Sequence, residues 1–148
     1  MRAVILLVCM GVVMAVIADS LAEGPSLQEY RWQNRLLLVF APEEDDPRLA
    51  RQMALPRAHG DGLAERDLLL MEIIGSKEMR IEGHAGSSTD AKALRDRHNV
   101  ASDEFAVILI GKDGGTKRRL SQPFATEDLF ATIDAMPMRQ HEMRERGS

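Results

Sequence analysis

The chain has 148 residues, of which 45% are hydrophobic and 28% are charged, with a formal net charge of −4 and one cysteine. This length suits one globular domain with a buried core, and the composition excludes a disordered or low-complexity chain. A mildly acidic chain with one Trp and one Tyr is poorly suited to nucleic acid, so we expect no nucleic-acid partner.

Residues 1–22 have the pattern of a secretory signal peptide. Arg2 gives a positive start, residues 3–18 (AVILLVCMGVVMAVIA) carry no charged side chain, and small residues follow. The spacing of small residues predicts cleavage after Ser20 or Ala22. The alternative is an uncleaved signal that tethers the protein to the membrane, although the apolar run is shorter than the roughly 20 residues of a spanning helix.

Export would change the chemistry of the chain, because the single cysteine, Cys9, lies inside the apolar run. Residues 23–148 would then form one periplasmic or secreted domain without a thiol, in a compartment where disulfides usually form. No stable membrane insertion is expected after cleavage. Thiol–disulfide oxidoreductase activity is excluded for such a chain.

Three short apolar runs follow an amphipathic lead-in. The lead-in is SLQEYRWQNR (26–35), whose expected packing residues are Leu27, Tyr30 and Trp32. The runs are LLLVF (36–40), LLLMEII (68–74) and FAVILI (105–110), and none alternates between apolar and polar residues. Strands that are covered by helices on both faces have this pattern.

Two helices are predicted between these strands. Asp46 and Pro47 have the sequence of an N-cap followed by a first-turn proline, and Pro56 is expected to end that helix. A second helix is expected near residues 87–98, with Asn99 as its stop.

A hairpin and a last helix complete the chain. Asp113-Gly114 between an apolar run and TKRRL predicts a tight turn, which makes residues 116–120 a basic, antiparallel edge strand. Thr126 is expected to cap a helix that Pro137 interrupts, and a charged extension follows.

The order is therefore strand, helix, strand, helix, strand, hairpin strand, helix. Right-handed crossovers would make the first connections parallel and place helices on both faces of the sheet. The expected fold class is α/β: a thioredoxin-like three-layer sandwich with a four-stranded mixed sheet.

Four segments resemble a bacterial exported family known as domain of unknown function 4174. They are RWQNRLLLVFAPEEDDP (31–47), ERDLLLMEIIG (65–75), FAVILIGKDGGTKRR (105–119) and IDAMPMRQHEMR (133–144). That family is similar to the thioredoxin-like domain repeated in animal extracellular proteins with sushi modules. The resemblance covers residues 27–146 and implies a fold and an exported location. It carries no established activity, so it assigns no catalytic residue and no cofactor.

The chain departs from redox-active thioredoxins at both halves of their active site. In those enzymes a Cys-x-x-Cys pair follows the first core strand, and a cis-proline precedes the third. Here the turn reads PEEDDP (42–47), and SDEF (102–105) offers no proline. Both departures again exclude disulfide exchange.

The acidic turn, Glu43, Glu44, Asp45 and Asp46, is the first candidate site. The start of a helix favours carboxylates, so the plainest interpretation is that Asp46 caps the helix and the other three are solvated. A sharper one is a site for a cation or a basic partner, because carboxylates are ligands that Ca²⁺ prefers. The spacing of a calcium loop is absent, so no metal ligand is assigned. A salt bridge is expected instead, to Arg31, Arg35 or Lys112.

Our leading hypothesis is an exported, non-catalytic module that binds another envelope or extracellular protein. Its candidate contacts are the acidic turn and residues of the hairpin, namely Lys112, Asp113, Lys117, Arg118 and Arg119. The alternative is a non-thiol enzyme or a metal-binding protein that uses Glu43 to Asp46. Glu72, the one charge in its apolar run, would need a partner such as Arg95 or Arg97 if it faced inward.

Overall fold

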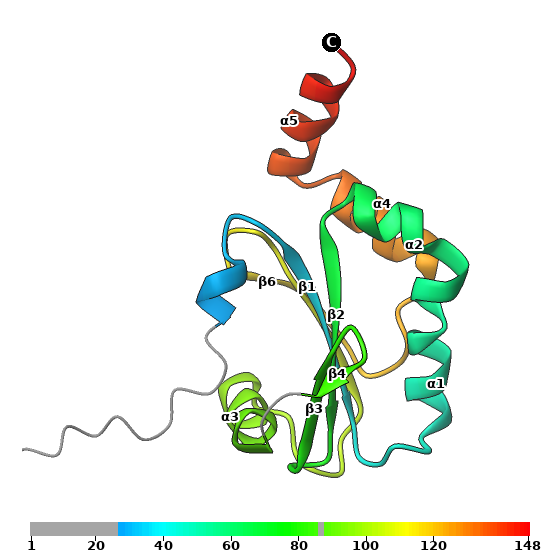
Figure 1. The fold of residues 1–148 in the computed structure, drawn as a ribbon, viewed down its shortest axis with the longest axis vertical. Coiled ribbons are helices and arrows are strands. Elements are labelled where there is room, and N and C mark those ends of the chain that lie inside the picture. The colour runs from blue at the N-terminus through cyan, green and yellow to red at the C-terminus, as the bar shows by residue number, and fades with distance from the viewer. Residues whose placement is uncertain (1–26, 86–87) are drawn as a thin grey trace, which may run out of the picture.

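The computed structural model describes residues 27–85 and 88–148 (Figure 1). The predicted signal peptide, with Cys9 and both cleavage positions, lies outside the described residues. Within the described ranges, no helix combines the length and the apolar character needed to cross a membrane.

The described strands form one mixed sheet in the order β4-β3-β2-β1-β5-β6. The central strand β1 pairs in parallel with β2 and antiparallel with β5. The three predicted apolar runs form these three strands, and TKRRL forms the edge strand β6 as predicted. The bounds are β1 Arg35–Ala41, β2 Leu68–Ile74, β3 Glu78–Ile81, β4 His84–Ala85, β5 Ala106–Ile110 and β6 Thr116–Leu120.

The prediction of four strands was wrong, because β3 and β4 extend the sheet beyond β2. The two strands are short and mostly polar, and Met79 is their single buried side chain, so they lack the apolar run by which the others were found. A parallel third strand was also wrong. Arg95, in the helix before β5, donates to the carbonyl group of Ala41 at the end of β1, and β5 begins at that end and runs back along β1.

Helices cover both faces of the sheet, as predicted (Figure 1). Helices α1, α2 and α4 pack on one face, and α3 with the 3-10 helix η1 packs on the other. Helix α5 extends away from the end of the sheet. The bounds are η1 Leu27–Tyr30, α1 Pro47–Met53, α2 Leu55–Glu65, α3 Ser88–His98, α4 Thr126–Asp134 and α5 Pro137–Arg146.

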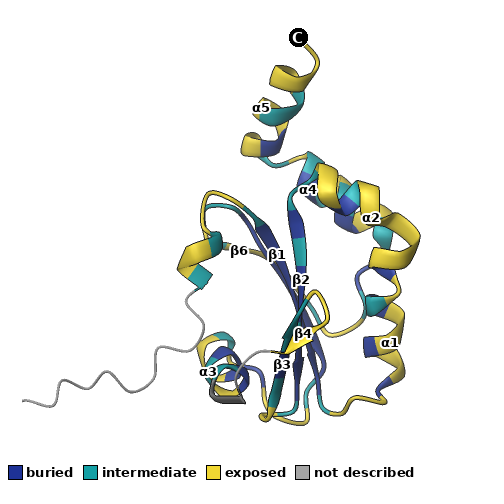
Figure 2. Ribbon diagram, in the orientation of Figure 1, coloured by how far each residue is buried: buried dark blue, intermediate teal, exposed yellow. Residues whose placement is uncertain are grey.

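Strand β1 divides the core into two layers. Leu37, Val39 and Ala41 face α1, α2 and α4, and the alternate residues from Leu36 to Phe40 face α3. Figure 2 shows the central strands buried, whereas the outer sides of the helices and most of α5 are exposed. A strand that is buried on both faces gains from apolar side chains at consecutive positions, which explains the absence of alternation in its sequence.

Three predicted turn and cap residues are confirmed. The Asp46 carboxylate accepts a hydrogen bond of 2.8 Å from the Arg48 backbone N–H and caps α1. Asn99 follows α3 with a φ of +52°, and Gly114 closes the hairpin with a φ of +83°.

Two other local predictions were wrong, and one was confirmed. Helix α1 ends at Met53, before Pro56 as expected, and Pro56 itself lies in the first turn of α2, where a proline loses no helical hydrogen bond. Thr126 is the first residue of α4, and the N-cap is Ala125. Trp32 does not pack into the core and is 59% exposed, whereas Leu27 and Tyr30 pack as expected.

Candidate functional site

The two predicted groups of site residues lie at opposite ends of the central strand β1. The acidic turn follows the C-terminal end of β1, and we call the region around these strand ends the acidic edge. Leu36 pairs with Ile110, so Lys112 and the hairpin turn lie beside the start of β1, at what we call the hairpin edge. The predicted salt bridge between the acidic turn and Arg31, Arg35 or Lys112 is therefore wrong, because these cations lie at the far end of β1.

At the acidic edge, arginines engage two of the four carboxylates. Glu44 accepts a hydrogen bond of 2.8 Å from Arg80 of β3, and Asp46 pairs with Arg48 at 2.6 Å. Glu43 and Asp45 are exposed and make no salt bridge within the described part of the chain. The four carboxylates do not converge, and the described residues contain no group of three side chains placed to hold a metal ion.

Arg80 is also the partner of Glu72, at 3.9 Å, and of Glu78, at 2.6 Å. Burial raises the pKa of Glu72, and the nearby Arg80 offsets only part of that effect. The expected partners, Arg95 and Arg97, were wrong, because β3, which carries Arg80 next to Glu72 in the sheet, was not predicted.

A buried cation lies beneath the acidic edge. Arg95 of α3 is 2% exposed, and its guanidinium donates to main-chain carbonyl groups from three segments. The acceptors are Ala41 at 2.6 Å, Ile73 at 3.5 Å, Gly75, Ala101 and Glu104 at 3.3 Å. Burial lowers the pKa of Arg95, and the carboxylates of Glu104 and Asp103 oppose this effect. One side chain thus joins the ends of β1 and β2 to the loop before β5.

Glu104 lies in the loop before β5, the segment where redox thioredoxins carry a cis-proline, and the described residues contain no cis peptide bond. Its carboxylate accepts hydrogen bonds of 3.1 Å from Arg119 and from the backbone N–H of Ala101. The bond from Ala101 N–H and the Arg119 guanidinium hold the pKa of Glu104 below its usual value. The loop is therefore fixed by charge rather than by a proline.

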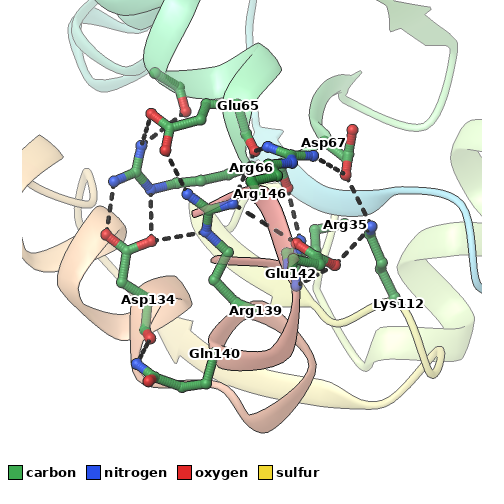
Figure 3. Close-up of polar contacts among 11 residues, drawn as sticks. Arg35, Glu65, Arg66, Asp67, Lys112, Asp134, Arg139, Gln140, Glu142 and Arg146 are labelled. Carbon is green, nitrogen blue, oxygen red and sulfur yellow. Dashed lines mark hydrogen bonds and ion pairs between the residues drawn. The ribbon is translucent and has the colours of Figure 1, made fainter. Parts of the chain in front are cut away.

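The hairpin edge holds an ionic network that the sequence reasoning did not find (Figure 3). Arg35 is 1% exposed and donates to both carboxylate oxygens of Glu142, at 3.2 and 3.3 Å. The Lys112 ammonium is bound to Glu142 and to Asp67, each at 2.8 Å. A carboxylate on α5 thus joins the first residue of β1 to Lys112, the second residue after β5.

The same network continues along α5. Arg139 is its single buried residue and pairs with Glu65 at 2.6 Å and with Asp134 at 3.1 Å. Asp134 also accepts a hydrogen bond of 2.6 Å from Arg66. Burial by itself raises the pKa values of Glu142 and Asp134, but the hydrogen bonds from the neighbouring cations outweigh it, and both pKa values are lowered. Helix α5 is therefore attached mainly by charge.

A sequence signal for this network does exist. Arg35, Lys112 and Arg139 all lie in the segments that resemble the exported family, and Arg35 directly precedes an apolar run. The remaining hairpin residues do not form one group. Asp113 and Lys117 pair at 2.7 Å at the hairpin edge, Arg118 is exposed, and Arg119 reaches the acidic edge.

The chain matches a known protein family. The profile of the family described as "Domain of unknown function (DUF4174)" matches residues 26–142. The chain belongs to this family. Within the DUF4174 match lie the acidic turn, Arg95, the hairpin and the network up to Glu142.

Longer animal proteins are similar to this DUF4174 chain. Sushi repeat-containing protein SRPX2 of Xenopus laevis is 28% identical over 123 residues, which are 81% of this chain and 27% of that protein. Coiled-coil domain-containing protein 80 of Danio rerio is 22% identical over 133 residues, which are 79% of this chain and 15% of that protein. The chain thus spans about a quarter or less of the length of these relatives.

The solved structure of a reduced 2-Cys peroxiredoxin from Plasmodium vivax is similar in fold. The TM-score is 0.57 with 18% identity, over 79% of this chain and 84% of the peroxiredoxin chain. This likeness confirms the thioredoxin-like fold that the order of elements predicted.

Proposed function

We propose that this DUF4174 chain is an exported, non-catalytic module that binds another envelope or extracellular protein. The observation that carries the proposal is the turn from Pro42 to Pro47. In a thioredoxin-like fold this turn is the place of the redox cysteines, and here it holds carboxylates, two of them engaged by Arg48 and Arg80. A thiolate is the nucleophile in thiol–disulfide exchange, and no cysteine follows Cys9.

The positions of Glu43 and Asp45 support binding rather than catalysis. Both carboxylates are exposed, and the backbone around them is held by Arg95 and by the Asp46 cap. Exposed charges on a rigid turn suit a complementary basic surface, because such charges speed association and select partners.

Two further observations support export and a modular role. Residues 1–22 have the pattern of a signal peptide. The similar animal proteins are several times longer than the matching region, so this domain occurs there as one part of a larger protein. A domain that recurs as one part of different proteins is consistent with a role as a binding module.

Crosslinking to envelope extract, followed by mass spectrometry, tests the proposal. The chain is expressed with its own leader, purified and crosslinked, and any captured protein is then purified and titrated. We expect saturable binding that is weakened in the double variant Glu43→Gln/Asp45→Asn. A matched control, Asp61→Asn/Glu127→Gln, removes two exposed carboxylates from α2 and α4 and should bind normally. Failure to capture any protein that binds saturably after purification would contradict the proposal.

A further inference from the structure

A pocket of about 270 Å³ opens at the hairpin edge, between the β5–β6 turn and the start of α5. Its lining combines three cations, one carboxylate and apolar side chains. The lining residues are Arg35, Gly111, Lys112, Asp113, Lys117, Met136, Pro137 and Met138. Neither the family description nor the proposed binding role assigns a function to this pocket.

The charge around the pocket is locally positive. Three of its lining side chains are cations, namely Arg35, Lys112 and Lys117, and one is a carboxylate, Asp113, whereas the whole chain carries a net charge of −4. Asp113 pairs with Lys117 at 2.7 Å, and Glu142 pairs with both Arg35 and Lys112. Helix α5, ten residues long, also begins at the pocket with Pro137, so the positive end of its dipole adds to this field.

Arg35 gives a second, independent sign of an anion site. This residue is 1% exposed and lines the pocket, and its Nε–H has no acceptor among the described residues. A buried donor without a partner costs free energy. This nitrogen is itself buried, so an acceptor on a ligand would recover that cost only after a small shift of the side chains that cover it. The other nitrogens of Arg35 and the Lys112 ammonium already bind the carboxylate of Glu142. The site therefore already binds one carboxylate of the chain itself.

Apolar surface adjoins these cations. Met138 is 39% exposed, and Met136 lies beside it in the pocket wall. Trp32 and Met138 are the exposed large hydrophobic residues of the described chain. Trp32 also lies at the hairpin edge, because its backbone N–H donates to the Lys112 carbonyl at 2.6 Å. Methionine side chains adapt to ligands of different shape.

We infer that this pocket binds a carboxylate that is joined to a short apolar group. Such a ligand has two sources, a small fatty acid and the C-terminal residue of a polypeptide. Arg35, Lys117 and the start of α5 would hold the carboxylate, and Met136 and Met138 would contact the apolar group. The inference is independent of the acidic edge and so does not depend on the proposed function.

Methyl NMR of the full chain, labelled with ¹³C at the methionine methyl groups, tests the inference. The probes are hexanoate and its neutral analogue hexanol, then N-acetyl-Ala-Leu as the free acid and as the amide. We expect a saturable shift of Met136 and Met138 with both acids and a much weaker shift with the neutral compounds. Met71 and Met79, buried on the other face of the sheet, should not move and serve as internal controls. The tighter of the two acids identifies the source.

Two variants separate the pocket from general electrostatics. Lys117→Gln should weaken the binding of hexanoate by roughly threefold or more, because it removes a cation from the rim. Arg118→Gln removes the same charge from the next position of β6, which does not line the pocket, and should leave binding unchanged. Both residues are exposed, so neither substitution should unfold the chain. Equal shifts with hexanol and hexanoate, equal effects of the two variants, or the absence of saturable shifts would each overturn the inference.

Discussion

The substitution Glu142→Gln should destabilise the protein far more than its position on a protruding helix suggests. It keeps the shape of the side chain and removes the charge that Arg35 and Lys112 share. Breaking a fully buried ion pair costs about 3–5 kcal/mol, because the remaining charge is left without compensation. Here Glu142 is 17% exposed, and Lys112 keeps Asp67 as a partner. We therefore expect a loss of about 2–3 kcal/mol in the free energy of unfolding.

Thermal and urea unfolding measure this loss, which corresponds to a decrease of roughly 6–12 °C in Tm for a domain of this size. The matched control is Glu145→Gln on the same helix, whose carboxylate is 68% exposed and pairs with His141. The control should change stability by less than about 0.5 kcal/mol. The difference between the two variants should persist in about 0.5 M NaCl, since salt screens buried pairs less than exposed ones.

Limited trypsin digestion gives a second readout of the same variant. The chain can be cut after Arg139 only when α5 leaves the domain, because Arg139 is 1% exposed. Glu142→Gln should increase the rate of that cut, and Glu145→Gln should not. If both variants had the same Tm and the same rate of cutting, the idea that charge attaches α5 would be refuted.

The other predictions concern acid, the α1 cap and the buried arginine. The pKa values of Glu142 and Asp134 are lowered in the folded state, so their contribution to the free energy of unfolding is complete above pH about 4.5 and is lost as the pH falls below about 4. A series of Tm values against pH measures this loss. Asp46→Ala should cost about 1 kcal/mol in urea unfolding through the loss of the cap, whereas the neighbouring Asp45→Ala should cost far less. Arg95→Leu should cost about 3 kcal/mol or more, because several buried carbonyl groups lose their donor, and a change below 1 kcal/mol would contradict the role given to Arg95.

The parts of the fold that could be predicted from sequence are those with strong local signals. The runs that begin at Leu36, Leu68 and Phe105 are short and almost continuously apolar, which is typical of strands covered on both faces. Asp46, Asn99 and Gly114 were found because each satisfies a backbone demand that few residue types meet. The short strands β3 and β4 give no such signal, because their positions depend on pairing with β2 rather than on apolar patterning.

The candidate site was predicted less well, because ion pairs depend on tertiary distances. Composition shows that the acidic turn and the basic hairpin exist, but only the antiparallel register of β1 and β5 shows that they lie at opposite ends of the sheet. Likewise, Arg35 and Glu142 are 107 residues apart in sequence, and no periodicity connects them.

The hydrogen bonds of Arg95 have a consequence for how this family can vary. All of its acceptors are main-chain oxygens, so these hydrogen bonds do not themselves select the side chains at positions 41, 73, 75, 101 and 104. New specificities could therefore arise by substitution in the neighbouring turn while the underlying architecture stays intact, as antibody loops diversify on a constant framework.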